Sequence, residues 1–292
     1  MDSPTNNERI EILDDGKLRV AAKFVELLRA NKLDTFERVM AFRGGEMKRS
    51  VPGRSTVRIE LARPAGGTQV AFLKRYELEY LSAGKKFLRL LRCAHDEAEH
   101  EWNCIRMLKQ DGFLTPEPVA LGQEKSSGAV TRSFLLTAEI EGGVAGHNLL
   151  PSLDARTRRA FVLEVAGLTR RFFDAGYAHR DYYLSHIFVV EDETRHSREL
   201  FLIDLQRVFK PSIFRRRWRV KDLASLAYTA QLAGATRGDL MTFYKTCFRA
   251  GEILPSDKAF IREIMRRVEA LHSRGPRYDV IWDNPGVRPP NV

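Results

Sequence analysis

Apolar and polar residues alternate in the first third of the chain in the way that strands require. Val57, Ile59 and Leu61 alternate with charged neighbours, and the apolar run 70–73 follows a Pro-Ala-Gly-Gly turn. Period-two alternation on both sides of a Gly-rich turn predicts paired strands. The apolar segment Ser133–Thr137 predicts one further buried strand.

Apolar positions at helical spacing dominate the rest of the chain. We expect a short helix over Val20–Leu33 and a Glu-rich helix over Ala94–Gln110, which ends before Gly112. A long helix is predicted over Ala155–Ala175, with Asp154 as its cap and Gly176 as its stop. From Val220 onward the pattern is helical, apart from a Pro-rich tail over 284–292.

The order of these elements predicts an α+β fold with two lobes. A β-rich N-terminal lobe with one main helix would span residues 1–141, and a mostly helical lobe would span 142–292. Nucleotide sites often lie in clefts between domains, so we expect the chemistry at the boundary of these lobes.

Two acidic residues follow the long helix in a distinctive arrangement. Asp181 lies in the polar turn His179-Arg180-Asp181, before the apolar strand Ile187–Val189, and Asp204 ends the next apolar strand. A phosphotransferase of the protein-kinase fold builds its centre this way: one Asp deprotonates the acceptor hydroxyl, and the second holds magnesium on the ATP phosphates. We therefore predict Asp181 as the catalytic base, Asp204 as the metal ligand, and His179 and Arg180 as structural residues of the turn.

A lysine and a glutamate upstream complete the predicted nucleotide site. Lys74 ends an apolar strand, and its ammonium would neutralise phosphate charge while Glu101 holds it in place. Glu97 and Glu99 lie on the same helix and compete for this role. Glu101 is preferred because Ile105, four residues later, belongs to an apolar stripe that would pack this helix face inward. A surface position for Glu101 remains the alternative.

The loop that would cover the phosphates is ambiguous. Arg43-Gly44-Gly45 and the segment Pro52–Thr56 are both candidates, and neither is a GxGxxG sequence. The second lies between two strand patterns, where a phosphate-covering hairpin belongs, so Arg54 and Ser55 are predicted to contact ATP. An ordinary hairpin turn explains the same residues equally well.

Two further residues near the turn have both structural and functional interpretations. His186 stands five residues after Asp181, where protein kinases carry a magnesium-binding Asn, and imidazole is a poor ligand for Mg²⁺. We expect His186 to be a polar residue close to the nucleotide. Asp222 is predicted to begin a helix, to lie buried against the catalytic turn and to bind backbone N–H groups.

The composition and charge of the chain indicate which kinds of partner it can bind. The 292 residues are 43% hydrophobic and carry a net charge of +10, which favours anionic partners, and the basic residues cluster at 156–159 and 214–219. A solvated helix face explains either basic cluster as well. Three scattered cysteines, a polar N-terminus and no long apolar run predict a cytoplasmic protein without an exported or membrane-spanning segment.

Taken together, the residues resemble those of bacterial lipopolysaccharide core heptose kinases, which are relatives of the 3-deoxy-manno-octulosonate kinases in the kinase-like superfamily. The similarity covers roughly residues 35 to 250. It rests on the following segments, in chain order: Gly53–Arg58, Phe72–Tyr76, Glu101–Leu108, Ser133–Thr137, His179–His186, Ile203–Arg207 and Arg217–Leu223.

This resemblance implies a reaction and a place. ATP, with Mg²⁺, would phosphorylate a heptose hydroxyl in the inner core of lipopolysaccharide, at the cytoplasmic face of the inner membrane. The family resembles this chain in carrying His at the position of His186, whereas Gln206 stands where the family usually has His. The implied partners are the core glycolipid, an anionic membrane surface that the 215–219 run would suit, and an acyl carrier protein.

Other functions remain open at this point. The same residues would serve a kinase of a protein Ser or Tyr or of a small alcohol. A non-catalytic kinase-like scaffold would bind ATP without transferring phosphate, and the complete set of Lys74, Glu101, Asp181 and Asp204 argues against it. Nucleic-acid binding is not expected, because the basic runs lack interleaved aromatic residues and a recognisable module.

Overall fold

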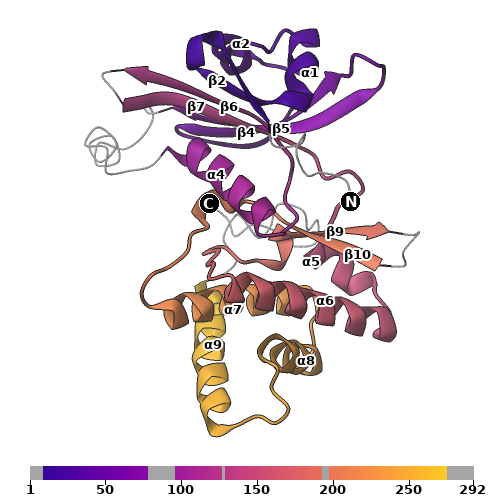
Figure 1. The fold of residues 1–292 in the computed structure, drawn as a ribbon. Helices are drawn as coiled ribbons and strands as arrows, with labels where there is room; N and C mark the ends of the chain where they lie inside the picture. The colour runs from indigo at the N-terminus through magenta and orange to yellow at the C-terminus, as the bar shows by residue number, and fades with distance from the viewer. Residues whose placement is uncertain (1–8, 78–95, 127–128, 193–196, 275–292) are drawn as a thin grey trace. The chain divides into compact units, whose positions relative to one another are not determined.

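The computed structural model describes residues 9–77, 96–126, 129–192 and 197–274 (Figure 1). The predicted tail over 284–292 and the first two residues of the helix predicted over 94–110 lie outside these ranges. The chain divides into two compact units, unit 1 (residues 1–110 and 115–140) and unit 2 (111–114 and 141–292). The lobe boundary predicted between residues 141 and 142 stays a prediction.

Unit 1 is built on a seven-stranded antiparallel sheet with the order β1-β2-β6-β7-β5-β4-β3. Its strands are β1 (Ile10–Leu13), β2 (Leu18–Ala21), β3 (Glu46–Val51), β4 (Arg54–Ala62), β5 (Thr68–Glu77), β6 (Pro118–Ser126) and β7 (Ala129–Ala138). The three α-helices of this unit in the described ranges are α1 (Val25–Ala30), α2 (Phe36–Ala41) and α4 (Glu97–Gln110).

The predicted alternation in β4 is confirmed. Val57, Ile59 and Leu61 are buried, and they join the hydrophobic cluster formed with α1 and α2. The opposite face of the sheet is covered by α4, which contacts β5, β6 and β7 (Figure 1). Because successive side chains of a strand point to opposite faces, the sheet presents an α1/α2 face and an α4 face.

The helix predicted over Val20–Leu33 is only partly correct. Leu18–Ala21 is strand β2, which pairs with β1 and β6, and helical structure begins only at Ala22. Leu18 and Val20 are buried, and Arg19 between them is half-buried, as expected for a strand. The strand alternation is followed directly by a helical pattern, with no turn signal in the sequence between them.

Unit 2 contains a small sheet with the order β10-β9-β8 and five α-helices among its described residues. Its strands are β8 (Val144–Ala145), β9 (Ile187–Asp192) and β10 (Ser197–Leu202). Its helices are α5 (Gly146–Leu149), α6 (Ala155–Asp174), α7 (Arg215–Leu232), α8 (Arg237–Phe248) and α9 (Pro255–Arg274). Helix α6 packs against α8, and α7 packs against α9.

The prediction for α6 is confirmed at both ends. Asp154 is the N-cap, and its carboxylate accepts hydrogen bonds from the backbone N–H groups of Arg156 and Thr157 at 2.8 Å. Gly176 follows the helix with φ +87°, a left-handed conformation that glycine adopts without a steric cost. The chain therefore turns directly from α6 toward the predicted catalytic turn.

Candidate functional site

The predicted site residues fall into two groups, one in each unit. Lys74, Glu101, Arg54 and Ser55 belong to unit 1. The residues of the second group all belong to unit 2: His179, Arg180, Asp181, His186, Asp204 and Asp222. Each group is described within its own unit.

In unit 1, Lys74 and Glu101 form an ion pair. The Nζ atom of Lys74 donates to Oε1 of Glu101 at 2.6 Å, and the two side chains are 14% and 3% exposed. A pair withdrawn from water this far keeps a fixed geometry, because separating the two groups would leave an uncompensated charge in a buried position. The lysine ammonium is therefore held at one position on the α4 face of the sheet.

Glu99, one of the competing glutamates of α4, has other partners. Glu99 accepts from Arg19 at 2.9 Å and from Gln123 at 3.2 Å, so it ties α4 to β2 and β6. Glu101 is buried next to Trp102 and Ile105, on the side of α4 that packs on the sheet. The apolar stripe of the helix thus brings Glu101 to Lys74.

The hairpin between β3 and β4 separates the two residues predicted to contact ATP. Thr56 pairs with Lys74, and Arg54 pairs with Tyr76 two residues along, so Arg54 shares the α4 face with Lys74. The Arg54 guanidinium lies 5.4 Å from the Tyr76 ring centroid. Ser55 lies one position out of phase, and its side chain belongs to the opposite, α1/α2 face.

The catalytic turn of unit 2 is built on a buried aromatic cluster. Tyr182 stacks on Phe172 of α6 with ring centroids 5.6 Å apart, and the Tyr182 hydroxyl is 3.0 Å from Thr169 Oγ1. His179 is fully buried, and a ring nitrogen lies 3.2 Å from the Ile203 carbonyl oxygen. Burial lowers the pKa of His179 to about 3, so this imidazole stays neutral.

Asp222 holds the backbone of this turn. Its two carboxylate oxygens accept hydrogen bonds from the N–H groups of His179 and Arg180, at 2.7 and 2.8 Å. Burial raises the pKa of Asp222 to about 7, against the lowering effect of these two bonds and of Lys221. The prediction that Asp222 begins a helix is wrong, because α7 starts at Arg215 and Asp222 serves the turn rather than its own helix.

Asp181 projects from the turn and is engaged by Arg207. Nη1 of Arg207 donates to both carboxylate oxygens of Asp181, each at 2.9 Å. The Asp181 side chain is 17% exposed, so it reaches solvent while its orientation is fixed. A carboxylate held in this way is positioned to accept a proton from a bound hydroxyl.

His186 connects the turn to the second acid. A ring nitrogen, Nδ1, lies 2.9 Å from the carbonyl oxygen of Asp181, and Nε2 lies 3.9 Å from Oδ2 of Asp204. With Nδ1–H donating to that carbonyl, Nε2 faces the Asp204 carboxylate. The three residues therefore lie together in unit 2.

Two residues of this region adopt a left-handed backbone that side chains rarely take. Arg180 has φ +71° and Asp204 has φ +55°. Such conformations cost on the order of 1–3 kcal/mol each and gather at functional sites, where the surrounding structure enforces them. At Arg180, the enforcing contacts are those of Asp222 and the packing of the guanidinium over Trp218, 5.5 Å from the ring.

The sequence did not assign roles to Arg207 and Lys221, and the structure brings both to the turn. The Lys221 ammonium donates to the Arg180 carbonyl oxygen. Burial lowers the pKa of Lys221 to about 8, opposed by the nearby carboxylates of Asp181 and Asp222. Arg207 lies in the segment Ile203–Arg207, and Lys221 lies in the segment Arg217–Leu223. Both segments contribute to the family resemblance, and this could have drawn attention to the two cations.

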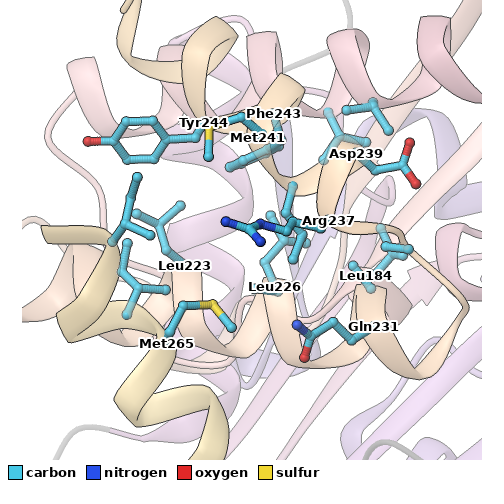
Figure 2. Close-up of a pocket in the computed structure, with 18 of the residues that line it drawn as sticks. Leu184, Leu223, Leu226, Gln231, Arg237, Asp239, Met241, Phe243, Tyr244 and Met265 are labelled. Carbon is cyan, nitrogen blue, oxygen red and sulfur yellow. The ribbon is translucent and has the colours of Figure 1, made fainter. Parts of the chain in front are cut away.

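An apolar cavity of about 550 Å³ lies within unit 2 among α6, α7, α8 and α9 (Figure 2). Leu223, Leu226, Met241, Phe243 and Met265 line it, with Gln231, Arg237 and Asp239 as polar residues in its wall. Its volume is in the range of small-molecule sites.

Comparisons with known proteins show the family to which the chain is similar. A family model described as the lipopolysaccharide kinase (Kdo/WaaP) family matches residues 45–246. A lipopolysaccharide core heptose(I) kinase WaaP of Pseudomonas aeruginosa is 31% identical over 266 residues, 85% of this chain and 94% of that protein. A protein of the same name from Escherichia coli is 28% identical over 82% of this chain and 92% of its own length.

A solved structure is similar over nearly the whole chain. It is described as WaaP in complex with acyl carrier protein, and it matches with a TM-score of 0.66 and 29% identity over 90% of this chain and 98% of that one. The α+β architecture and the acid-bearing turn therefore define a phosphotransferase with a kinase-like fold, as predicted. The chain belongs to the lipopolysaccharide kinase (Kdo/WaaP) family, which implies the use of ATP. Among the helices of the described ranges, none is long and apolar enough to cross a membrane.

Proposed function

We propose that this kinase transfers the γ-phosphate of ATP to a heptose hydroxyl of the lipopolysaccharide inner core, with Asp181 as the base. The observation that carries the proposal is the Asp181 carboxylate, fixed through both oxygens by Arg207 at 2.9 Å on a turn bound by Asp222. The acceptor is proposed from the family and from the relatives named as core heptose kinases.

Asp181 accepts the hydroxyl proton as the sugar oxygen attacks the γ-phosphorus, and the bond from that phosphorus to the ADP oxygen breaks. A phosphoryl-transfer transition state carries spread negative charge and is stabilised mainly by positioned cations. Arg207 and Lys221 both lie beside Asp181 and supply such charge. Arg207 has a second task, because it orients the base before substrate arrives.

Lys74 and Glu101 are proposed as the pair that positions ATP. A lysine fixed at 2.6 Å from its glutamate contacts phosphate oxygens from one defined point. Arg54, on the same face of the sheet as Lys74, adds a second positive charge where glycine-rich loops offer backbone N–H groups.

Asp204 is the proposed ligand of Mg²⁺, and its chemistry fits this ion. Magnesium prefers oxygen ligands and is usually held by one or two carboxylates together with phosphates and waters. The ion would neutralise charge on the ATP phosphates. His186 lies beside this carboxylate, with Nε2 3.9 Å from Oδ2 of Asp204.

An acyl carrier protein is the proposed protein partner. The net charge of +10 suits an acidic carrier, and a similar structure is described as a complex with one. The apolar cavity of unit 2 offers room for an acyl chain (Figure 2). Leu226→Glu, which adds a charge to the cavity wall, is expected to weaken capture of acylated carrier relative to an unacylated one. Equal capture of both forms would contradict the use of this cavity.

The reaction is tested by following phosphate transfer from γ-labelled ATP to purified core glycolipid that lacks phosphate. Transfer by the wild-type protein to the heptose, identified by mass spectrometry of the core oligosaccharide, is expected. Transfer to protein hydroxyls instead would favour a protein kinase, and ATP binding without any transfer would favour a scaffold.

A further inference from the structure

The first turn of α7 and the residues just before it form an exposed apolar and basic projection. We refer to residues Ile213–Arg217 as the α7 tip. Ile213 is 65% exposed and Phe214 is 69% exposed, and the three following arginines are exposed as well. Among the exposed large apolar side chains of the described residues, these two are the most exposed and the only neighbours in sequence.

The backbone at this point adopts a conformation that bulky residues rarely take. Phe214 has φ +56°, a left-handed conformation that costs roughly 1–2 kcal/mol for a residue with a bulky side chain. Scattered exposed apolar residues are ordinary in soluble proteins. Two adjacent large apolar side chains, 65% and 69% exposed, are not scattered in this way, and they indicate a surface that becomes covered.

The charge of the α7 tip identifies what covers it. Arg215, Arg216 and Arg217 follow the two apolar residues directly, and the Arg216 guanidinium pairs with Glu263 at 2.6 Å. Apolar side chains next to exposed arginines match the interface of an anionic bilayer, where the rings and alkyl groups enter the acyl boundary and the guanidinium groups stay with the headgroups. An acidic soluble protein would match the same charge, and the vesicle experiment described below distinguishes it from a bilayer.

The same helix connects the α7 tip to the catalytic turn. Trp218, one turn after Phe214, packs edge-on against Phe209 at 5.2 Å and lies beneath the Arg180 guanidinium. Lys221 and Asp222 then bind the turn itself. At 1.5 Å per residue, the α7 tip and Lys221 are separated by about 10 Å along the helix axis.

We propose that the α7 tip docks this kinase on an anionic phospholipid surface and thereby presents the catalytic turn to an acceptor embedded in that surface. The proposal deepens the proposed function and rests on it for the identity of the acceptor. The docking step itself depends only on the exposed residues of the α7 tip.

The test measures co-sedimentation of the full-length protein with two kinds of vesicle, phosphatidylcholine alone and equal parts of phosphatidylcholine and phosphatidylglycerol. The wild type is expected to bind the anionic vesicles preferentially. Ile213→Ser/Phe214→Ser is expected to weaken binding about tenfold through lost apolar insertion. Arg215→Gln/Arg217→Gln is expected to weaken it about thirtyfold, at about 1 kcal/mol per arginine.

Two control variants match these changes in chemistry and lie elsewhere in unit 2. Leu254→Ser removes an apolar side chain that is 56% exposed, and Arg266→Gln/Arg267→Gln removes two exposed arginines of α9. Both are expected to bind vesicles as the wild type does. Equal losses in control and test variants would mean that net charge or general hydrophobicity, rather than the α7 tip, determines binding.

Activity distinguishes a failure of docking from a failure of the proposed function. Ile213→Ser/Phe214→Ser is expected to keep wild-type transfer to delipidated core oligosaccharide and to lose most transfer to glycolipid in anionic vesicles. Binding to anionic vesicles that neither this variant nor Arg215→Gln/Arg217→Gln weakens would overturn the proposal in favour of an acidic soluble partner for the α7 tip. Absence of transfer to the free oligosaccharide as well would count against the proposed acceptor and leave the binding result intact.

Discussion

The two parts of the candidate site achieve their geometry in different ways. In unit 1, the Lys74 ammonium is held by the 2.6 Å ion pair with Glu101, between a strand and the helix that packs on it. In unit 2, Asp181 lies on a turn whose backbone and side chain are held by Asp222, Lys221 and Arg207. Strand pairing supports the backbone that carries Lys74, whereas side chains support the backbone of the turn that carries Asp181.

The difference has a physical origin. Strand β5 has its backbone hydrogen bonds satisfied by β4 and β7, so Lys74 needs support only at its tip. Residues 179–181 belong to no strand, and Arg180 has a left-handed backbone conformation. Its buried N–H groups find an acceptor in Asp222 instead.

The largest expected effect comes from removing that acceptor. Asp222→Ala leaves the N–H groups of His179 and Arg180 buried without a partner and is expected to lower the free energy of unfolding by about 2–4 kcal/mol. Transfer activity should also fall, because the turn carries Asp181. Urea unfolding followed by circular dichroism measures the first effect. The control is Glu252→Ala, which removes an exposed carboxylate in the same unit.

A smaller but more selective loss is expected in unit 1. Lys74→Met removes the charge proposed to contact ATP and should lower kcat/KM for ATP about 10²–10³-fold, a typical loss for one electrostatic contact in a transition state. The variant also leaves the buried Glu101 carboxylate without the Lys74 ammonium, so its unfolding curve is measured first and the kinetics are compared at a temperature where it is folded. Steady-state kinetics with Lys48→Met, an exposed lysine of β3, as control would separate this effect from general charge loss. Equal effects of the two variants would contradict the proposed role.

Arg207 tests whether orientation of the base matters apart from charge. Arg207→Lys keeps the charge but loses the rigid guanidinium that contacts both oxygens of Asp181, and we expect kcat to fall about tenfold with little change in KM. A variant that raises KM alone would indicate substrate binding instead. Rapid-quench measurement of a single turnover assigns the loss to the chemical step.

The smallest expected effect is a change in pH dependence. Lys221 has its pKa lowered to about 8, chiefly by burial and also by Arg180 and Arg207, while Asp181 and Asp222 oppose the shift. The ammonium is therefore present below pH 8 and lost as the pH rises through that value, so kcat should decline there. Lys221→Arg, whose pKa lies well above this range, is expected to show no decline. An identical decline in both proteins would assign the titration to another group.

Much of unit 1 could be predicted from the sequence, because its signals are local. The alternation of Val57, Ile59 and Leu61 defines β4, and the apolar stripe of α4 selects Glu101 over Glu99. The hairpin that contains Arg54 and Ser55 predicts an ATP contact for both residues. Adjacent side chains of a strand point to opposite faces of the sheet, so Ser55 does not share the face of Arg54 and Lys74.

Unit 2 shows where sequence reasoning ends. The turn and its acids were predicted from their order, and Asp154 from its position before α6. The contacts that hold the turn join residues far apart: Arg207 and Asp181 are 26 positions apart, and Lys221 and Arg180 are 41 apart. No periodicity or spacing in one sequence indicates that such pairs meet, since only tertiary packing brings α7 to the turn.

Phosphate transfer by Asp181→Asn tests the central claim most directly. Asparagine keeps the size of the side chain and one oxygen for Arg207 but cannot take a proton at neutral pH. With γ-labelled ATP and unphosphorylated core glycolipid, we predict that transfer falls about 10²–10⁴-fold while ATP binding and the unfolding curve stay as in wild type. The control Glu252→Gln should transfer normally. Transfer by Asp181→Asn at the wild-type rate would contradict the assignment of Asp181 as the base.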